Sequence, residues 1–206
     1  MNLDTYISDI IEREAAAVRN IPIDNKYAEA IDLIYEYVHQ KNGKLVTSGM
    51  GKAGQIALNI ATTFSSTGTP AIFLHPSDAQ HGDLGIIQAN DILLLVSNSG
   101  KTNEILQLIE LSKRLVSDIP IIVITGNKDS VLASKANIVL DTGNPPEVCP
   151  LGLTPTTSTT VMTVIGDILV TLMMKKINFT VEDYAKRHHS GYLGEKSKMF
   201  ISNNNK

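Results

Sequence analysis

Short aliphatic runs alternate with helical patterns along most of the chain. The runs have the length and composition of strands that are covered on both faces, and they occupy residues 44–47, 71–74, 92–96, 121–124 and 138–140. Between them, apolar residues recur at helical spacing over 55–64, 103–116 and 130–135. A strand–helix–strand repeat predicts right-handed crossovers and a parallel sheet. The pattern therefore predicts an α/β fold of three layers, a sandwich in which helices flank a five-stranded parallel sheet.

Three further helical patterns surround this region. Apolar faces run from Ile7 to Val18 and from Ala30 to Val38. Residues 158–176 are apolar nearly all round, so one face should meet its own sheet and another a second surface. We expect that surface to be a partner subunit; the alternative is cover by the N-terminal helices. The expected organisation is a single domain over 1–206, with N-terminal helices at about 3–40, an α/β core at about 44–178 and a C-terminal segment at about 180–197.

The loop after the first predicted strand is rich in glycine. Residues 48–54 read Ser-Gly-Met-Gly-Lys-Ala-Gly, which matches the G-x-G-x-x-G pattern of dinucleotide sites. The acid that such a site places after the second strand is missing, because His75-Pro76 stands there. A P-loop fits less well, since Val46 and Ala53 replace its glycine and its Ser/Thr. The loop instead predicts a backbone that can approach an anion, with Lys52 nearby; the alternative is a tight turn with a solvated lysine.

The loop after the third predicted strand is rich in hydroxyl groups. Residues 97–102 read Ser-Asn-Ser-Gly-Lys-Thr and lead directly into a predicted helix. Hydroxyl donors and the free amides of a helix N-terminus can together hold a phosphate. Capping of the helix alone would need one such residue, whereas three are present. We therefore expect a phosphate-binding loop here.

Composition narrows the class of protein. The 206 residues carry a net charge of −3, so no overall basic field exists to hold a nucleic acid. No signal peptide is evident, and the most apolar stretch, 161–174, is expected to be too short to span a bilayer. The single cysteine, Cys149, favours a reducing compartment, and its apolar surroundings predict a buried structural thiol in place of a nucleophile. We expect a soluble cytoplasmic protein without nucleic-acid or membrane partners.

Five short blocks, taken together and in order, closely resemble the sugar isomerase (SIS) family. They are Ser48-Gly49-Met50-Gly51-Lys52, Thr67-Gly68-Thr69-Pro70, His81-Gly82-Asp83-Leu84-Gly85, Ser97-Asn98-Ser99-Gly100 and Cys149-Pro150-Leu151-Gly152-Leu153-Thr154-Pro155-Thr156. The third and fifth blocks are similar in particular to the arabinose 5-phosphate isomerases of that family. The resemblance covers about residues 30–197 without large gaps.

This resemblance implies the SIS fold and an aldose–ketose isomerase. The implied reaction interconverts arabinose 5-phosphate and ribulose 5-phosphate through an enediolate, and feeds 3-deoxy-manno-octulosonate synthesis for lipopolysaccharide or capsule. A homotetramer with sites between subunits is implied, with no cofactor and no required metal. Many relatives carry C-terminal regulatory domains of the cystathionine-synthase type, and the chain resembles the short form that lacks them.

The resemblance also assigns site residues. It places the phosphate of the substrate on Ser48, Ser97, Ser99 and Thr102, with Gly49, Gly51 and Asn98 beside them. It gives catalytic roles to Lys52, Glu104, Glu147 and His188. It places the remainder of the substrate near His81, Lys101 and His189. The expected task of His188 is ring opening or proton relay, delivered across a subunit boundary.

Glu147 is the base that we expect to move the proton. It lies in an apolar, proline-rich loop where no local cation would hold its pKa down, and a carboxylate of raised pKa suits general base catalysis. Glu104 is the alternative, although its place in the first turn of a helix is also explained by the helix dipole. Lys52 is expected to polarise the carbonyl oxygen or to stabilise negative charge on the enediolate.

Two residues depart from the family's usual pattern. His189 stands where relatives have proline, which leaves open which histidine of the pair acts. Lys101 stands where relatives often have glutamate, which should tighten anion binding. An acidic, sugar-like end product is expected to fit the positive cleft near Lys52 and Lys101, so feedback inhibition is a further prediction.

Other readings remain open at this point. The chain could isomerise a different phosphosugar, or act as a non-catalytic phosphosugar sensor, although sensors of this fold generally carry an added DNA-binding or regulatory module. A metal site is not expected, because the histidines and acids lie in separate loops without H-x-x-H or H-E-x-x-H spacing; they are His75, His81, Asp83, His188 and His189.

Overall fold

The computed structural model describes residues 2–204 and contains the predicted parallel sheet. Its strands are β1 (Leu45–Gly49), β2 (Ala71–Phe73), β3 (Ile92–Val96), β4 (Ile121–Thr125) and β5 (Ile138–Asp141). They pair in the order β2-β1-β3-β4-β5, and every pairing is parallel. The predicted strands agree with these bounds to within two residues: β1, β4 and β5 extend further at their carboxyl ends, β1 begins one residue later and β2 ends one residue earlier.

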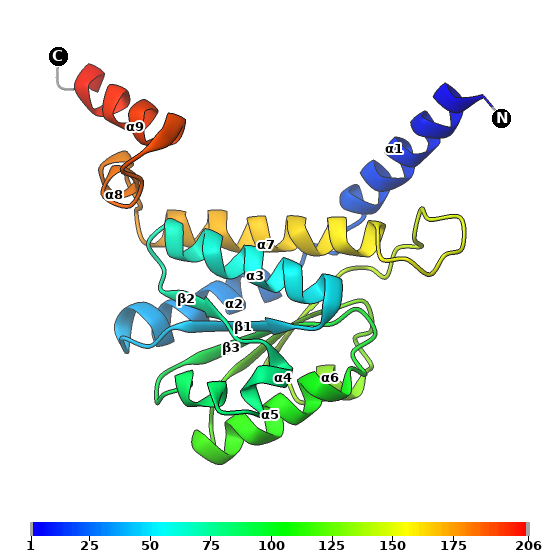
Figure 1. Ribbon diagram of the computed structural model, residues 1–206, viewed down its shortest axis with the longest axis horizontal. Helices are drawn as coiled ribbons and strands as arrows, with labels where there is room; N and C mark the ends of the chain where they lie inside the picture. The colour runs from blue at the N-terminus through cyan, green and yellow to red at the C-terminus, as the bar shows by residue number, and fades with distance from the viewer. Residues whose placement is uncertain (1, 205–206) are drawn as a thin grey trace.

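Helices cover both faces of the sheet, as the sequence predicted (Figure 1). One face carries α2 (Lys26–Ile34), which continues as a π-helical segment (Tyr35–Gln40), together with α3 (Gly51–Ser66) and α7 (Thr157–Lys176). The other face carries α4 (Pro76–Ala79), a 3-10 turn (Asp83–Ile86), α5 (Asn103–Leu115) and α6 (Val131–Ser134). This is the expected three-layer arrangement.

Alternate residues of each central strand enter two separate hydrophobic cores. In β3, Ile92, Leu94 and Val96 pack toward α2, α3 and α7, whereas Leu93 and Leu95 pack toward α5. All five of these side chains are fully buried. This is the reason that the strands read as unbroken aliphatic runs: both of their faces are covered.

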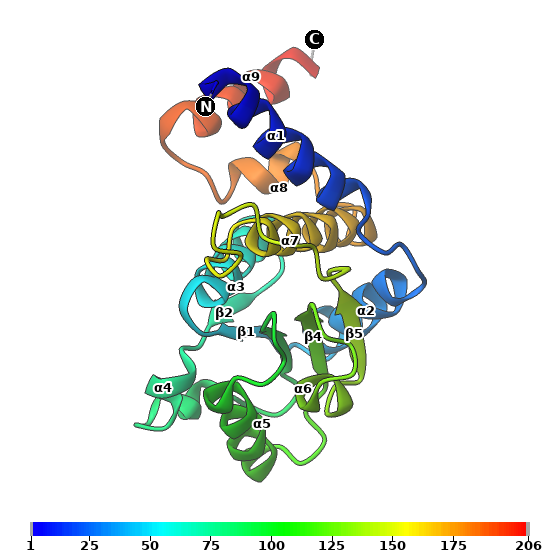
Figure 2. The same ribbon diagram turned by 90° about the vertical axis from the view of Figure 1, so that its right-hand side faces the viewer.

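Three helices lie outside the sandwich, on the far side of α7 from the sheet (Figure 2). They are α1 (Leu3–Arg19), α8 (Val181–Ala185) and α9 (Gly191–Asn204). The patterns of the sequence predicted α1 but not α4, α8 or α9. The two helices of the C-terminal segment lack a clear apolar period, and α9 leaves Tyr192, Leu193 and Met199 exposed.

The long helix α7 packs against α3, α2 and α1 within the same chain. Cover by the N-terminal helices, the alternative reading, therefore accounts for part of its apolar surface. The expectation that the most apolar stretch is too short for a bilayer concerned residues 161–174 alone; the helix that contains them, α7, has 20 residues and is long and apolar enough to cross a membrane by length and composition. Half of its most apolar window is buried inside the fold, which is the behaviour of a core helix.

Asp91 ties the start of β1 to the turn that precedes β3. Its carboxylate is 1% exposed and accepts hydrogen bonds from Lys44 N (3.0 Å), Lys44 Nζ (2.7 Å) and Gln88 N (2.8 Å). We expect Asp91→Asn to lower the free energy of unfolding by about 2 kcal/mol, because the amide cannot accept from all three donors and leaves an ammonium group without its counter-charge.

Urea unfolding followed by circular dichroism measures this change. Asp118→Asn is the matched control, since Asp118 is an exposed aspartate in the turn before β4, and its free energy of unfolding should stay within about 0.5 kcal/mol of the wild type. Equal stability of the Asp91 and Asp118 variants would contradict the prediction.

Candidate functional site

A cavity of about 540 Å³ opens at the carboxyl ends of the strands. The loops after β1, β3, β4 and β5 contribute to it, and the start of α7 closes one side. The strand order 2-1-3-4-5 changes direction between β1 and β3, and open α/β sheets bind ligands at such a switch point. The lining residues are Met50, Lys52, Ala53, Val96, Ser97, Asn98, Ser99, Lys101, Thr102, Gly126, Asn127, Asn144, Pro155, Ser158, Thr159 and Met162.

The hydroxyl-rich loop after β3 is held in shape by its own side chains. Ser97 Oγ lies 2.9 Å from Thr102 Oγ1 and accepts a hydrogen bond from Gly100 N at 3.2 Å. Ser99 Oγ accepts one from Lys101 N, also at 3.2 Å. The loop ends where α5 begins, so the free amides of that helix point toward this end of the cavity. The arrangement suits a tetrahedral anion.

The glycine-rich loop contributes less to the cavity than the sequence suggested. Ser48 is fully buried, and its hydroxyl donates to the Leu74 carbonyl oxygen at 2.6 Å. A Cβ on Gly54 would lie 2.5 Å from Gly49 O, so these glycines allow α3 to start close against the end of β1. The sequence predicted three phosphate ligands in this loop, Ser48, Gly49 and Gly51. None of the three is among the residues that line the cavity. The loop reaches it through Met50, Lys52 and Ala53.

Positive charge at the cavity comes from Lys52 and Lys101. Both side chains are exposed and both line the cavity. Lys52 follows β1 and Lys101 follows β3, so the two strands that flank the switch point each deliver one cation. Two cations and a hydroxyl-rich loop favour a ligand with a phosphate group.

Glu147 is not among the residues that line the cavity, but it binds the N-terminus of α7 at Thr156 and at Ser158, which does line it. One carboxylate oxygen accepts hydrogen bonds from Thr156 N (2.7 Å), Thr156 Oγ1 (2.9 Å) and Ser158 N (3.2 Å). Burial raises the pKa of Glu147, but the hydrogen bonds from Ser158 and Thr156 together outweigh it and hold the pKa below its usual value. The expectation of a raised pKa for Glu147 was therefore wrong. The donors that lower this pKa, Thr156 and Ser158, lie where the loop enters α7.

Helix α1 fixes the main chain on both sides of this glutamate. The guanidinium of Arg13 donates to the Glu147 carbonyl oxygen at 3.0 Å. The Thr157 hydroxyl accepts from Val148 N at 3.1 Å and donates to Glu14 Oε1 at 2.9 Å. Glu147 therefore has its carbonyl, its carboxylate and the next amide all bound, which leaves its loop little freedom.

The remaining predicted residues lie away from the cavity lining. Glu104 is half-buried in the first turn of α5, as predicted, and His81 is exposed in the turn after α4. His188 follows α8 and stacks on the Tyr184 ring, with 3.7 Å between ring centroids, while His189 is exposed. Among residues 2–204 the structure shows no group of three His, Cys, Asp or Glu side chains placed to hold a metal ion.

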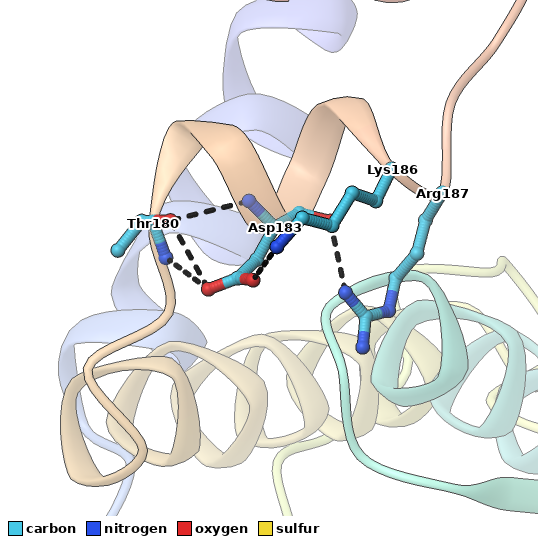
Figure 3. A network of polar contacts seen from close by, with 4 residues as sticks. All are labelled: Thr180, Asp183, Lys186 and Arg187. Atoms are coloured by element: carbon cyan, nitrogen blue, oxygen red, sulfur yellow. Dashed lines mark hydrogen bonds and ion pairs between the residues drawn. The ribbon is translucent and has the colours of Figure 1, made fainter.

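The turn that carries His188 is anchored by a polar network at the start of α8 (Figure 3). Thr180 and Asp183 form a reciprocal capping box, and Lys186 Nζ lies 3.2 Å from Asp183 Oδ1. The ammonium of Lys186, with help from the Thr180 hydroxyl, lowers the pKa of Asp183. Arg187 donates to the Asp183 carbonyl oxygen at 2.9 Å, so the chain just before His188 is held in a defined turn.

Cys149 is partly exposed, which corrects the prediction of a buried thiol. Its sulfur accepts a hydrogen bond from Thr154 N at 3.2 Å, and this contact lowers the pKa of the thiol. The loop 149–155 turns outward before α7, so the residues around the cysteine do not cover it. The loop exposes four apolar residues: Pro150, Leu151, Leu153 and Pro155.

Asn127 and Asn144 are among the polar residues of the cavity that sequence reasoning missed. They follow β4 and β5 closely and line the cavity beside Gly126. The rule that ligands bind beyond the carboxyl ends of parallel strands pointed to their loops. Neither belongs to one of the blocks that resemble a family, so the pattern of motifs left them out.

Comparison with known proteins places this site in a family. The SIS domain matches residues 37–172, about two thirds of the chain. The chain belongs to the SIS family. Arabinose 5-phosphate isomerase KdsD of Yersinia pestis is 46% identical over 192 residues, which make up 93% of this chain and 57% of that protein. The chain thus spans less than two thirds of the length of this curated relative.

Two solved structures of the SIS fold match over nearly their whole length. A candidate phosphosugar isomerase involved in capsule formation from Bacteroides fragilis is 62% identical, with a TM-score of 0.91 over 93% of this chain and 100% of that one. Protein c3406 of Escherichia coli CFT073, in complex with arabinose 5-phosphate, is 33% identical, with a TM-score of 0.84 over 91% of this chain and 97% of that one. The predicted family and the predicted fold are both confirmed.

Proposed function

We propose that this SIS-family chain is an isomerase that interconverts arabinose 5-phosphate and ribulose 5-phosphate. The observation that carries the proposal is the cavity at the switch point, where Lys52 and Lys101 meet a hydroxyl-rich loop and the N-terminus of α5. KdsD of Yersinia pestis and c3406 with its bound arabinose 5-phosphate support this choice of substrate.

The reaction needs an anchored phosphate and a base beside the reacting carbons. We assign the phosphate to Ser97, Ser99 and Thr102, whose hydroxyls lie at the cavity. The base removes the proton on C2 of the open-chain aldose, and the electron pair of that C–H bond forms the enediolate. The proton then returns to C1, while the proton of the C2 hydroxyl passes to O1 and the carbonyl moves to C2. Lys52 is placed to stabilise the negative oxygen of that intermediate, and no atom is gained or lost.

Glu147 is the base in this proposal, with Glu104 as the alternative. The lowered pKa keeps Glu147 ionised at neutral pH, so it is ready to accept a proton, although it is a weaker base than a carboxylate of raised pKa. Binding of the substrate would exclude water from the cavity and raise the basicity of this carboxylate.

A second copy of the chain supplies His188 in this proposal. The cavity lies at the N-terminal end of α7, whereas His188 follows the helix after its C-terminal end, and a helix of 20 residues spans about 30 Å. The fold therefore places His188 of one chain beyond the opposite end of α7 from the cavity of that chain. The homotetramer that the sequence predicted offers the histidine of a neighbour, and His189 remains the alternative within that pair.

Turnover of three phosphosugars tests the assignment. We expect kcat/KM for arabinose 5-phosphate to exceed those for ribose 5-phosphate and glucose 6-phosphate by at least about tenfold, because hydroxyl-binding groups discriminate more strongly than the shared phosphate does. Ketose formation by the purified full chain, without added metal, gives the measurement. Comparable turnover of all three sugars would contradict the substrate, and binding without any turnover would indicate a phosphosugar sensor.

The cellular setting follows from the same proposal. A soluble cytoplasmic isomerase of this kind would supply 3-deoxy-manno-octulosonate synthesis for lipopolysaccharide or capsule, and the capsule-related Bacteroides fragilis structure favours the latter. Feedback by an acidic, sugar-like end product would act at the cavity, where Lys52 and Lys101 provide the charge. We propose neither a cofactor, a nucleic acid nor a membrane as a partner.

A further inference from the structure

Three asparagines from three neighbouring strand ends line the cavity. Asn98 follows β3, Asn127 follows β4 and Asn144 follows β5. The loops after β3 and β4 are joined by hydrogen bonds, because Gly126 N donates to Asn98 O at 3.1 Å and Asn127 Nδ2 donates to Ser99 O at 3.5 Å. The end of β5 is joined to the end of β4, because Thr142 N donates to Thr125 O at 3.0 Å. The phosphate loop and the asparagines therefore form one continuous wall.

Two of these amides converge on Gly126. A Cβ on that glycine would lie 2.5 Å from Asn98 Oδ1, 3.1 Å from Asn144 Oδ1 and 3.2 Å from Thr142 Oγ1. Any side chain at position 126 would displace the amides. The glycine thus leaves room for two carbonyl oxygens to approach the same small volume beside the phosphate loop.

The side-chain oxygen of Asn98 lacks a donor. Asn98 Oδ1 is buried and has no hydrogen-bond partner among the residues that the structure describes. A buried acceptor without a partner destabilises the fold, so a ligand that donates to it is bound more tightly than one that does not. A phosphate monoester is mostly a dianion at neutral pH and has no hydrogen to give. The phosphate therefore cannot supply the missing donor, whereas a hydroxyl group of the ligand can supply it once the Asn98 amide turns from Gly126 toward the cavity that Asn98 lines.

We propose that Asn98 and Asn144 bind a hydroxyl group of the phosphosugar, immediately beside its phosphate. This inference rests on the proposed function and adds the residues that read the sugar. A neutral amide pair suits the task, since each amide offers an acceptor and two donors and leaves the charge of the phosphate site unchanged. Asn98, which the family resemblance placed among the phosphate ligands, then serves the sugar through its side chain.

The backbone of Asn144 allows a clean test. Its φ is +48°, a left-handed conformation that glycine adopts without strain, so Asn144→Gly removes the amide and keeps the turn. Asn42→Gly is the matched control, because Asn42 has a φ of +58° and lies before β1, at the amino ends of the strands and so opposite the cavity. Both variants carry the same loss of side chain and the same gain in backbone freedom.

Calorimetric titration with arabinose 5-phosphate, and competition by inorganic phosphate, give the two readouts. We expect Asn144→Gly to weaken binding of the sugar phosphate about tenfold, which corresponds to about 1.4 kcal/mol, and to change competition by inorganic phosphate less than twofold. Asn42→Gly should leave both values unchanged. The ratio of the two affinities separates loss of a hydroxyl contact from damage to the phosphate loop.

The other outcomes separate the inference from the proposed function. Equal weakening of both ligands would mean that Asn144 supports the phosphate loop only, and unchanged affinity for the sugar phosphate would mean that it contacts nothing. A wild-type chain that binds arabinose 5-phosphate but fails to turn it over would overturn the proposed reaction and leave the hydroxyl contact standing. Failure of the wild type to bind the sugar phosphate would overturn both.

Discussion

Replacement of Glu147 by glutamine is expected to lower kcat for arabinose 5-phosphate by about 10²- to 10⁴-fold, the usual contribution of a general base. Glutamine keeps an oxygen that can accept from Thr156 N and Ser158 N, the donors that bind the carboxylate at 2.7 and 3.2 Å. The loop should therefore keep its shape and the variant should still bind the sugar phosphate. Only the ability to take up a proton is lost.

The pH dependence of this variant separates two roles of Glu147. Its pKa is held below the ordinary value of 4.5 in the folded chain, so the ionised carboxylate adds stability above that pH and loses it as the pH falls through the lower, folded pKa. Urea unfolding should therefore show a larger difference between wild type and Glu147→Gln at pH 7 than at pH 3. Protonation of Glu147 should also lower kcat/KM at acid pH, and this fall should have its midpoint below pH 4.5.

Glu182→Gln is the matched control for the glutamine substitution. Glu182 is an exposed glutamate in the first turn of α8, so the chemical change is the same and both carboxylates lie near a helix N-terminus. Its kcat should stay within about twofold of the wild type, as for a surface substitution. Turnover by Glu147→Gln at the rate of this control would reduce Glu147 to a cap of α7 and transfer the role of base to Glu104.

The sequence predicted the sheet well because burial alone decides it. Each central strand is covered on both faces, so its aliphatic run begins and ends close to where the strand does. Most of the errors lie at the carboxyl ends, where Ser48 and Gly49 pair with Leu95 and Val96 although neither has the composition of a strand. Helix α3 was predicted to begin at Gln55 but begins at Gly51. Its first turn contains glycines because Gly54 packs closely against Gly49, and glycines there read as a loop in the sequence.

The candidate site was harder to predict because its contacts cross between loops. The pKa of Glu147 depends on donors 9 and 11 residues further along the chain, which local sequence does not bring together. Asn144 meets Asn98 only because β5 and β3 both border β4. His188 shows the limit most clearly, since its distance from the cavity along α7 leaves its proposed role to a neighbouring subunit.

Gly100→Ala is expected to destabilise the fold by about 4 kcal/mol and to weaken binding of the phosphate. Gly100 has a φ of +62°, which costs an alanine about 1–2 kcal/mol. The added Cβ would also lie 2.0 Å from Ser130 Oγ and 2.4 Å from Ser130 Cβ, and overpacking of a buried site costs about 1–3 kcal/mol. Ser130 cannot retreat freely, because it is buried and caps α6 by accepting from Ala133 N at 3.2 Å.

The clash can be separated from the backbone strain by Gly152→Ala. Gly152 has the same φ of +62°, but a Cβ there would meet nothing within 4 Å, so this variant measures the strain alone. The difference in free energy of unfolding between the two alanine variants, from urea titrations, then gives the cost of displacing Ser130. Because Gly100 N is bound to Ser97 Oγ, the displacement must also move the hydroxyl that we assign to the phosphate. The prediction is contradicted if Gly100→Ala and Gly152→Ala have the same stability and the same competition by inorganic phosphate. In that case the position of Ser97 does not depend on this turn. The loop would then not be the rigid anion site on which the proposed reaction depends.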